Sequence, residues 1–334
     1  MHTKIIFLNV FLLLSFFIHG QDVHYSQWDA APLYMNPALT GNAACSWRTG
    51  VNYRTQDQYT KPFETYNAFI DKRIKPGFVG SHAWIGLGTN LYYDNAGDGP
   101  LKKIQAMVLV NYSKGFNADN TIYGSMGAGF GITNRQINNN YTFDNQWNGT
   151  TFEFDPNFAS GEKFTKASIF YPDFNFGLHF HHQLNKGVIY ELGSSLNHIN
   201  RPIESFLGGS KHRMDRKSIN YLRTYIKIGE NMMINPSAYY IWQNNIDQLI
   251  LGSNFEFTQA YLTLSAGVWY RFQRDIIPLI GIEYHLFKLQ FTYDVNVSKE
   301  RVASAYKGGF EVTLVKSFCP KKKVDKTCKS LQFH

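Results

Sequence analysis

The chain has 334 residues, 16% of them aromatic, and a formal net charge of +8 at pH 7. This length suits one large domain or two. The mean hydropathy of −0.30 and the lack of a long apolar run after residue 20 exclude a bundle of membrane-spanning helices. They do not exclude a β-barrel, whose strands need only about 10 alternating residues each.

Residues 1–20 are expected to be a secretory signal peptide. A basic start at His2 and Lys4 precedes an apolar run over residues 5–18, and the small residue Gly20 stands directly before Gln21. The run is shorter than the roughly 20 residues that cross a bilayer, so we expect cleavage near Gly20/Gln21. The basic charge of the exported chain then suits anionic lipid or an acidic partner rather than nucleic acid.

Residues 21–45 are too irregular to form a regular strand. Pro32 and Pro37 remove backbone donors, and Asn36-Pro37 and Thr40-Gly41 favour turns. The segment also holds aromatic and apolar residues that need a surface to pack against. We therefore expect a fixed, non-repetitive segment against or inside the periplasmic mouth of the barrel that the following residues predict. Its role is either that of a plug that stabilises the wall or that of a contact for a partner.

The rest of the chain up to residue 318 alternates between apolar and polar residues with period two, which is typical of strands with one apolar face. In LQFTYDVNV, residues 289–297, Phe291 and Tyr293 point one way while Thr292 and Asp294 point the other. About fourteen such segments occur, at 46–56, 62–73, 82–95, 101–116, 119–134, 167–183, 186–200, 217–229, 231–243, 246–258, 260–272, 276–286, 287–297 and 305–318.

The connections between these segments are sorted by length. After even-numbered segments most are very short, whereas two connections after odd-numbered segments, 134–166 and 201–217, are long. Short turns at one end and long loops at the other are typical of an outer-membrane barrel, and an even strand count returns both termini to the periplasmic side. We predict an all-β fold, a transmembrane antiparallel β-barrel of about fourteen strands with a polar lumen. A soluble β-sandwich is the alternative.

Three patterns could carry chemistry, and each has a simpler interpretation. The run GAGFG, residues 127–131, lies inside a strand pattern without a following helix, which favours close packing in the wall over phosphate binding. His179 and His181 share a strand face beside His182, but no Glu or Cys nearby in the sequence completes a metal site, so we interpret them as lumen-facing residues. YYDNAGDGP, residues 92–100, lacks the terminal Glu of a calcium loop and favours a polar extracellular turn.

No catalytic motif is present, since neither Gly-x-Ser-x-Gly nor His-Glu-x-x-His occurs in the sequence. A Ser, His and Asp set assembled from distant strands would make a barrel hydrolase, but no pattern points to one. We therefore expect no catalytic residues, no cofactor-binding residues, no metal ligands and no enzymatic activity.

Three cysteines occur, Cys45, Cys319 and Cys328. An oxidising compartment permits a disulfide, and Cys319 with Cys328 is the most economical pairing, which leaves Cys45 over. Residues 319–334 also carry a run of lysines and are expected to form a basic periplasmic tail. That tail is either a solvated end that balances lipid phosphates or a clip for a periplasmic partner.

An ordered series of motifs runs from residue 21 to about residue 318. The first group is Gln21, Asp22, Tyr25, Ser26, Gln27, Pro32, Leu33, Tyr34, Asn36, Pro37, Ala38 and Gly41. Later members are Asn52-Tyr53-Arg54, Pro62–Tyr66, Trp84–Gly88, Asp94–Gly97, Thr142–Gln146, Phe154-Asp155, Ser160–Glu162, His198–Pro202 and Gly309–Leu314. Together these motifs resemble the PorP/SprF family of outer-membrane proteins, which belong to the type IX secretion system of Bacteroidetes.

The resemblance implies a non-enzymatic, multi-pass outer-membrane barrel that supports secretion or surface attachment of cargo, including large adhesins whose C-terminal signal domain is recognised. Gliding motility is one setting. The implied partners are outer-membrane lipid, the cargo itself, and periplasmic ring or peptidoglycan-associated components, and the motif residues of 21–41 become candidate plug or partner contacts. A porin or transporter for small solutes is the alternative. The expected parts are the signal peptide 1–20, the periplasmic/plug segment 21–45, the barrel 46–318 and the tail 319–334.

Overall fold

The structure is a computed structural model, and it describes only part of the chain. The described residues are 22, 25–27, 30–56, 63–96, 101–137, 144–155, 157–158, 166–206, 212–299, 301–302 and 307–319. The expected signal peptide, Gln21, Cys328 and the tail beyond Cys319 lie outside them.

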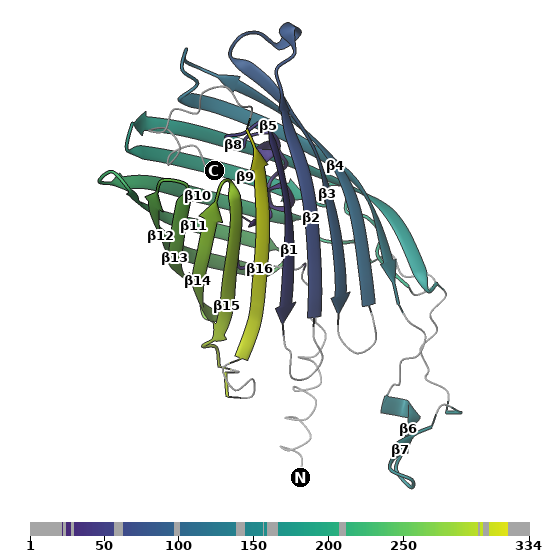
Figure 1. Ribbon diagram of the computed structural model, residues 1–334. Helices are drawn as coiled ribbons and strands as arrows, with labels where there is room; N and C mark the ends of the chain where they lie inside the picture. Colours follow the sequence, from purple (N-terminus) through teal and green to yellow (C-terminus); the bar gives the residue numbers. More distant parts are fainter. Residues whose placement is uncertain are drawn as a thin grey trace, which may run out of the picture.

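Fourteen antiparallel strands form one closed barrel, in which each strand pairs with its neighbours in the chain and β16 returns to β1 (Figure 1). The strands are β1 (Trp47–Gln56), β2 (Phe63–Ile74), β3 (Ala83–Ala96), β4 (Leu101–Gly115), β5 (Ile122–Gln136), β8 (Ser168–Asn185), β9 (Val188–Asn197), β10 (Lys217–Ile228), β11 (Met232–Gln243), β12 (Ile246–Gln259), β13 (Leu262–Arg271), β14 (Asp275–Tyr284), β15 (Phe287–Asn296) and β16 (Lys307–Phe318). The predicted barrel and its strand number are confirmed. Among the described residues no helix is long and apolar enough to cross a membrane.

The period-two pattern sorts side chains between the outer surface and the lumen. On β15, Gln290 and Asp294 are buried, while Phe291 and Tyr293 are 42% and 41% exposed. Polar residues therefore point inward and large apolar residues point outward, the reverse of a soluble sandwich. The same alternation on β8 buries Asp173 and exposes the phenylalanines beside it.

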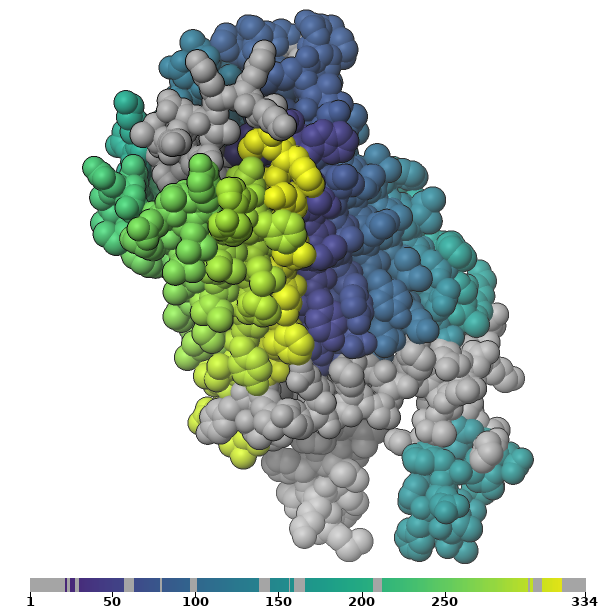
Figure 2. Space-filling model, in the orientation of Figure 1, coloured from purple at the N-terminus to yellow at the C-terminus, as the bar shows by residue number. Residues whose placement is uncertain are grey.

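The two ends of the barrel differ in their connections. At one end, here the short-turn end, the longest connection is residues 75–82, which holds a 3-10 helix, η4 (Gly77–Val79). At the other end, the long-loop end, residues 137–167 and 198–216 make the longest connections, as the sequence predicted. The first of these holds η5 (Asp144–Gln146) and a two-stranded hairpin, β6 (Trp147–Asn148) and β7 (Glu153–Phe154), which stands away from the barrel (Figures 1 and 2).

The wall closes where β1 meets β16, with Trp47 opposite Phe318 at the short-turn end, and Figure 2 shows the two strands in direct contact. A disulfide between Cys45 and Cys319 lies at the same place. The expected pairing of Cys319 with Cys328 is therefore wrong. That pairing was chosen because the two cysteines are close in the sequence. Barrel closure instead brings together Cys45 and Cys319, which are 274 residues apart. A bond across so long a loop strongly restricts the unfolded chain.

Candidate functional site

The segment before β1 passes through the lumen from one end of the barrel to the other. Asp22 is bonded to Lys103 and His198 at the long-loop end. Gly41 lies at the short-turn end, where its backbone N–H donates to Asp71. We call residues 22–45 the lumen segment. The segment was expected against or inside the periplasmic mouth of the barrel. In the structure it extends through the interior, with Asp22 at one end and Gly41 at the other, because the inward faces of the strands offer polar partners along their full length.

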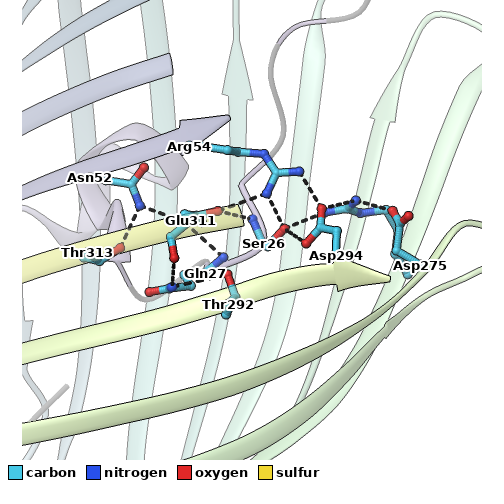
Figure 3. Close-up of polar contacts among 10 residues, drawn as sticks. Ser26, Gln27, Asn52, Arg54, Asp275, Thr292, Asp294, Glu311 and Thr313 are labelled. Carbon is cyan, nitrogen blue, oxygen red and sulfur yellow. Dashed lines mark hydrogen bonds and ion pairs between the residues drawn. The ribbon is translucent and has the colours of Figure 1, made fainter. Parts of the chain in front are cut away.

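Ser26 lies at the centre of a buried polar network where the barrel closes (Figure 3). Its backbone N–H donates to Glu311 at 2.7 Å, and its hydroxyl donates to Asp294 at 2.6 Å. The guanidinium groups of Arg54 and Arg271 donate to the same hydroxyl oxygen at 2.5 and 3.0 Å. One serine of the lumen segment is thus held by side chains from β1, β13, β15 and β16.

Gln27 extends this network toward the wall (Figure 3). Its backbone N–H donates to Glu311 at 3.3 Å, and its side-chain amide donates to the Thr292 hydroxyl at 3.3 Å. Asn52 on β1 donates to the same carboxylate at 2.6 Å. The Glu311 carboxylate therefore accepts from two residues of the lumen segment, Ser26 and Gln27, and from two residues of the wall, Asn52 and Arg54.

The charges of the network nearly cancel. Arg54 pairs with Asp294 at 2.6 Å and with Glu311 at 3.2 Å, and Arg271 pairs with Asp275 at 2.5 Å. These five side chains belong to five different strands, and none is more than 10% exposed. A buried charge is costly unless it is paired and hydrogen-bonded. The network therefore holds the lumen segment in one position, because any other position would leave buried charges without partners.

A second charged cluster fixes the segment at the long-loop end. The Asp22 carboxylate lies 2.8 Å from Lys103 Nζ and 2.5 Å from His198 Nε2, and His198 Nδ1 lies 2.8 Å from Asp173. Burial disfavours the charged forms of Asp22 and His198, but the attraction between the paired charges is stronger than this effect. They hold the pKa of Asp22 well below its usual range and raise the pKa of His198 to about 9. At neutral pH the cluster is therefore ionised.

This cluster predicts a loss of stability in alkali. The folded pKa of His198 lies above the ordinary value of 6.5, so its contribution is fully present below pH 6.5 and is lost as the pH rises through about 9. A shift of that size corresponds to roughly 3 kcal/mol. We expect the melting temperature to fall more steeply between pH 7 and 10 for the wild type than for His198→Asn. Equal slopes in a thermal titration of both proteins would contradict this.

Two short helices shape the middle of the lumen segment: α2 (Pro32–Met35) and η3 (Pro37–Leu39). Each begins at a proline. Proline suits the first position of a helix, because the backbone N–H that it lacks would have no partner within the helix. The Asn36 side chain caps η3 by accepting from the Ala38 N–H at 2.8 Å and donates to the Leu178 carbonyl at 2.9 Å. Asn36 therefore joins a turn of the segment to the backbone of β8.

Apolar side chains of the segment fill the lumen on two sides. Met35 and Leu39 join a cluster with inward residues of β10 to β14, and Leu33 joins a cluster with Phe69, Met107 and Leu109. Tyr34 stacks on Tyr92, with ring centroids 5.5 Å apart. The apolar residues of the segment, which were expected to need a surface to pack against, thus pack against the inner wall.

Wall glycines allow the segment to lie directly on the strands. A Cβ atom at Gly127 would stand 2.4 Å from the backbone at Pro37 and Ala38, and one at Gly86 would stand 2.0 Å from the Thr40 carbonyl oxygen. Gly177 is equally tight, at 1.9 Å from the Asn36 side chain. The close packing predicted for the GAGFG run is present at Gly127, where the neighbour is the lumen segment.

Replacing Gly127 by alanine is expected to displace the segment, because the obstructing atoms are backbone and cannot rotate away. Overpacking of this kind costs about 1–3 kcal/mol. Gly129→Ala on the same strand is the matched control, since its Cβ would meet only ordinary contacts at 3.4 Å or more. We expect Gly127→Ala, but not Gly129→Ala, to lower the melting temperature and to expose the segment to protease. Similar behaviour of both variants would refute the close approach.

At the short-turn end the segment is tied to β2. The Gly41 N–H donates to Asp71 at 2.7 Å, and Arg73 donates to the carbonyl oxygens of Gly41 and Ala43 at 2.9 and 2.6 Å. Arg48 pairs with Asp71 at 2.9 Å. Gly41 has a φ of +69°, which favours glycine at this bend.

Most of the candidate plug or partner residues chosen from the sequence lie inside the barrel. The structure brings ten of them into the lumen: Asp22, Tyr25, Ser26, Gln27, Pro32, Leu33, Tyr34, Asn36, Pro37 and Gly41. Gln21 lies outside the described residues. Their partners on the wall, including Arg54, Asp173, Arg271, Asp294 and Glu311, were not predicted as such, although Arg54 and Glu311 belong to the motif series. A charge on the polar face of a strand was the signal that could have found them.

A family model described as "Type IX secretion system membrane protein PorP/SprF" matches residues 18–315. The sequence matches no curated protein closely enough for comparison.

Solved barrels resemble the fold. The CymD monoaromatic hydrocarbon channel has 10% identity, a TM-score of 0.54, and covers 87% of this chain and 93% of its own. The Ralstonia pickettii toluene transporter TbuX has 10% identity, a TM-score of 0.50, and coverages of 86% and 94%. At this identity the likeness concerns the fold alone.

Proposed function

The chain belongs to the PorP/SprF family of type IX secretion system membrane proteins, and we propose that it is an outer-membrane barrel that supports secretion and surface attachment of cargo of that system. We expect the cargo to be adhesin-like proteins with a C-terminal signal domain. Periplasmic ring or peptidoglycan-associated components are further expected partners. We expect gliding motility to be one setting for this role.

The observation that carries this proposal is the coincidence of the family motif with the lumen segment. Residues such as Ser26 and Asn36 belong to the motif and also make buried bonds to the wall. We infer that the family motif serves to hold the segment inside the barrel and that the barrel ends, rather than the lumen, bind partners.

The long-loop end offers a surface for the cargo. On the β6–β7 hairpin, Trp147, Phe152 and Phe154 are 44%, 74% and 45% exposed, although all three are large and aromatic. Aromatic residues gathered on an exposed surface mark protein contacts. In outer-membrane barrels the longer loops face the outside, where the cargo would be displayed.

A solute channel is the rival function, and the interior gives it less support. One cavity beside His179 and Glu191 measures about 70 Å³, and another beside Asp22 and Tyr34 about 10 Å³. The first has room for a few water molecules. A porin needs a continuous water-filled lumen.

The test is surface display of cargo in cells that lack this chain. We expect a large adhesin to disappear from the cell surface, to return with a plasmid copy, and to co-purify with the barrel from outer membranes. Protease shaving of intact cells and affinity purification measure these effects. Normal display without the chain would overturn the proposal, and a growth defect tied to one nutrient would favour the channel.

A further inference from the structure

Two histidines and a glutamate meet on the lumen side of β8 and β9. In the strand register His181 is opposite Glu191 and His179 is opposite Gly193. Donor atoms of His179, His181 and Glu191 lie within 4.8 Å of one another. Glu191 was not predicted to lie near these histidines, because it reaches them across a strand pair and not along one strand.

His179 has a buried nitrogen without a partner. The residue is 3% exposed, and its Nε2 has no hydrogen-bond partner. The other ring nitrogen, Nδ1, lies 3.0 Å from the Tyr221 hydroxyl. A histidine that binds a metal commonly donates its second N–H to a fixed acceptor in this way, which leaves the first nitrogen free for the ion.

The Glu191 carboxylate is divided between two neighbours. Its Oε1 lies 3.1 Å from His181 Nδ1, and its Oε2 lies 2.5 Å from Arg223. The arginine therefore fixes the carboxylate and leaves Oε1 directed toward the histidines. The carboxylate is also 2% exposed, so little water competes for it.

Gly193 leaves room for the Tyr221 ring beside His179. A Cβ atom there would stand 2.1 Å from the Tyr221 ring, so a larger residue would push this ring away from His179. Tyr221 also accepts from the Asn36 amide at 3.4 Å. The Tyr221 side chain thereby connects the cluster to the lumen segment.

From this geometry we propose that His179 Nε2, His181 Nδ1 and Glu191 Oε1 bind one Zn²⁺ ion. Two imidazoles and a carboxylate suit zinc, whereas Ca²⁺ and Mg²⁺ prefer oxygen ligands throughout. Zinc ligands at about 2.0–2.2 Å stand roughly 3.4 Å apart. On binding, the most distant donor atoms therefore close in by up to about 1.4 Å, whereas His181 Nδ1 and Glu191 Oε1 already lie 3.1 Å apart. The fourth position faces the cavity lined by His179, Glu191 and Arg223, where a water molecule completes the site.

Arg223 lowers the expected zinc affinity, because its guanidinium charge would repel a divalent cation bound close to it. The Glu191 carboxylate stands between them and contacts both. We therefore expect weaker binding than at a site with two carboxylates. The ion would bridge β8 and β9 and strengthen the wall under Asn36.

The test uses untagged mature protein in detergent, treated with chelator and dialysed against Zn²⁺. We expect one equivalent of zinc per chain by elemental analysis, and a tetrahedral visible absorption spectrum when Co²⁺ replaces Zn²⁺. His179→Asn and Glu191→Gln should lower the zinc affinity at least tenfold. Tyr221→Phe should lower it about tenfold, because it removes the hydroxyl that holds His179 Nδ1. His182→Asn, which changes the neighbouring residue on the other face, is the matched control.

Each variant is first checked for a folded barrel by heat-modifiable mobility, and Mg²⁺ at the same concentration is the ion control. A rise in melting temperature with Zn²⁺ in the wild type and the His182→Asn control, but not in Glu191→Gln, supports the site. No bound zinc in the wild type, or unchanged zinc in folded His179→Asn, would overturn it. The outcome is independent of cargo display, so the two proposals fail separately.

Discussion

Deleting residues 21–41 from the mature chain is expected to convert a barrel with no measurable conductance into an ion-conducting pore. The segment fills the lumen with buried side chains such as Leu33, Met35 and Leu39, and no part of the fourteen-stranded wall replaces them. A barrel of this strand number leaves a wide interior when nothing occupies it. Planar bilayer recordings of the purified protein should therefore show discrete current steps only after the deletion.

Two controls separate an open pore from a damaged barrel. Heat-modifiable mobility on gels reports whether the wall still closes. Deletion of the hairpin residues 147–154 shortens the chain outside the lumen, so it shows whether any deletion makes the barrel leak. We expect no current steps for the hairpin deletion. If the wild type conducts as strongly as the variant without residues 21–41, the segment does not close the barrel and the channel function gains support. Loss of cargo display in the same deletion would join the lumen segment to the proposed function.

Arg54→Met is expected to lower the free energy of unfolding by about 3–5 kcal/mol. The substitution removes the partner of Asp294 and Glu311 and leaves Arg271 as the one remaining arginine in a network with three buried carboxylates, those of Asp275, Asp294 and Glu311. Urea titration of the protein folded into lipid vesicles measures the change. Adding Glu311→Gln should recover part of the loss, because it removes one of the uncompensated charges.

Arg201→Met is the matched control for this prediction. Arg201 pairs with Asp215 at 3.1 Å, but the two side chains are 45% and 29% exposed. Solvent-exposed ion pairs contribute about 0–1 kcal/mol, so we expect a change within that range. An effect of the same size for both substitutions would mean that burial of the Ser26 network does not matter.

The architecture of the wall followed from local patterns. Alternation along segments such as 287–297 identified fourteen strands, and the connection lengths separated the two ends of the barrel. Both features are properties of neighbouring residues, because side-chain direction in a strand repeats every two residues. The motif residues of 21–41 likewise marked a fixed, non-repetitive segment ahead of the barrel.

The partners of these residues came only from the tertiary structure. Ser26 bonds Asp294 across 268 residues, and Cys45 bonds Cys319 across 274, separations at which sequence spacing carries no information about contact. The choice of Cys328 failed for this reason. The position of Glu191 beside His181 depends on strand register, which the sequence analysis did not specify.

The sequence by itself therefore determined a closed wall with a polar lumen and an irregular segment in front of it. Tertiary structure decided that this segment crosses the lumen from Asp22 to Gly41 and that buried charges hold it there. The physical reason is that strand periodicity acts locally, whereas the lumen exists only after β16 has paired with β1 and the inward side chains of all strands face one another.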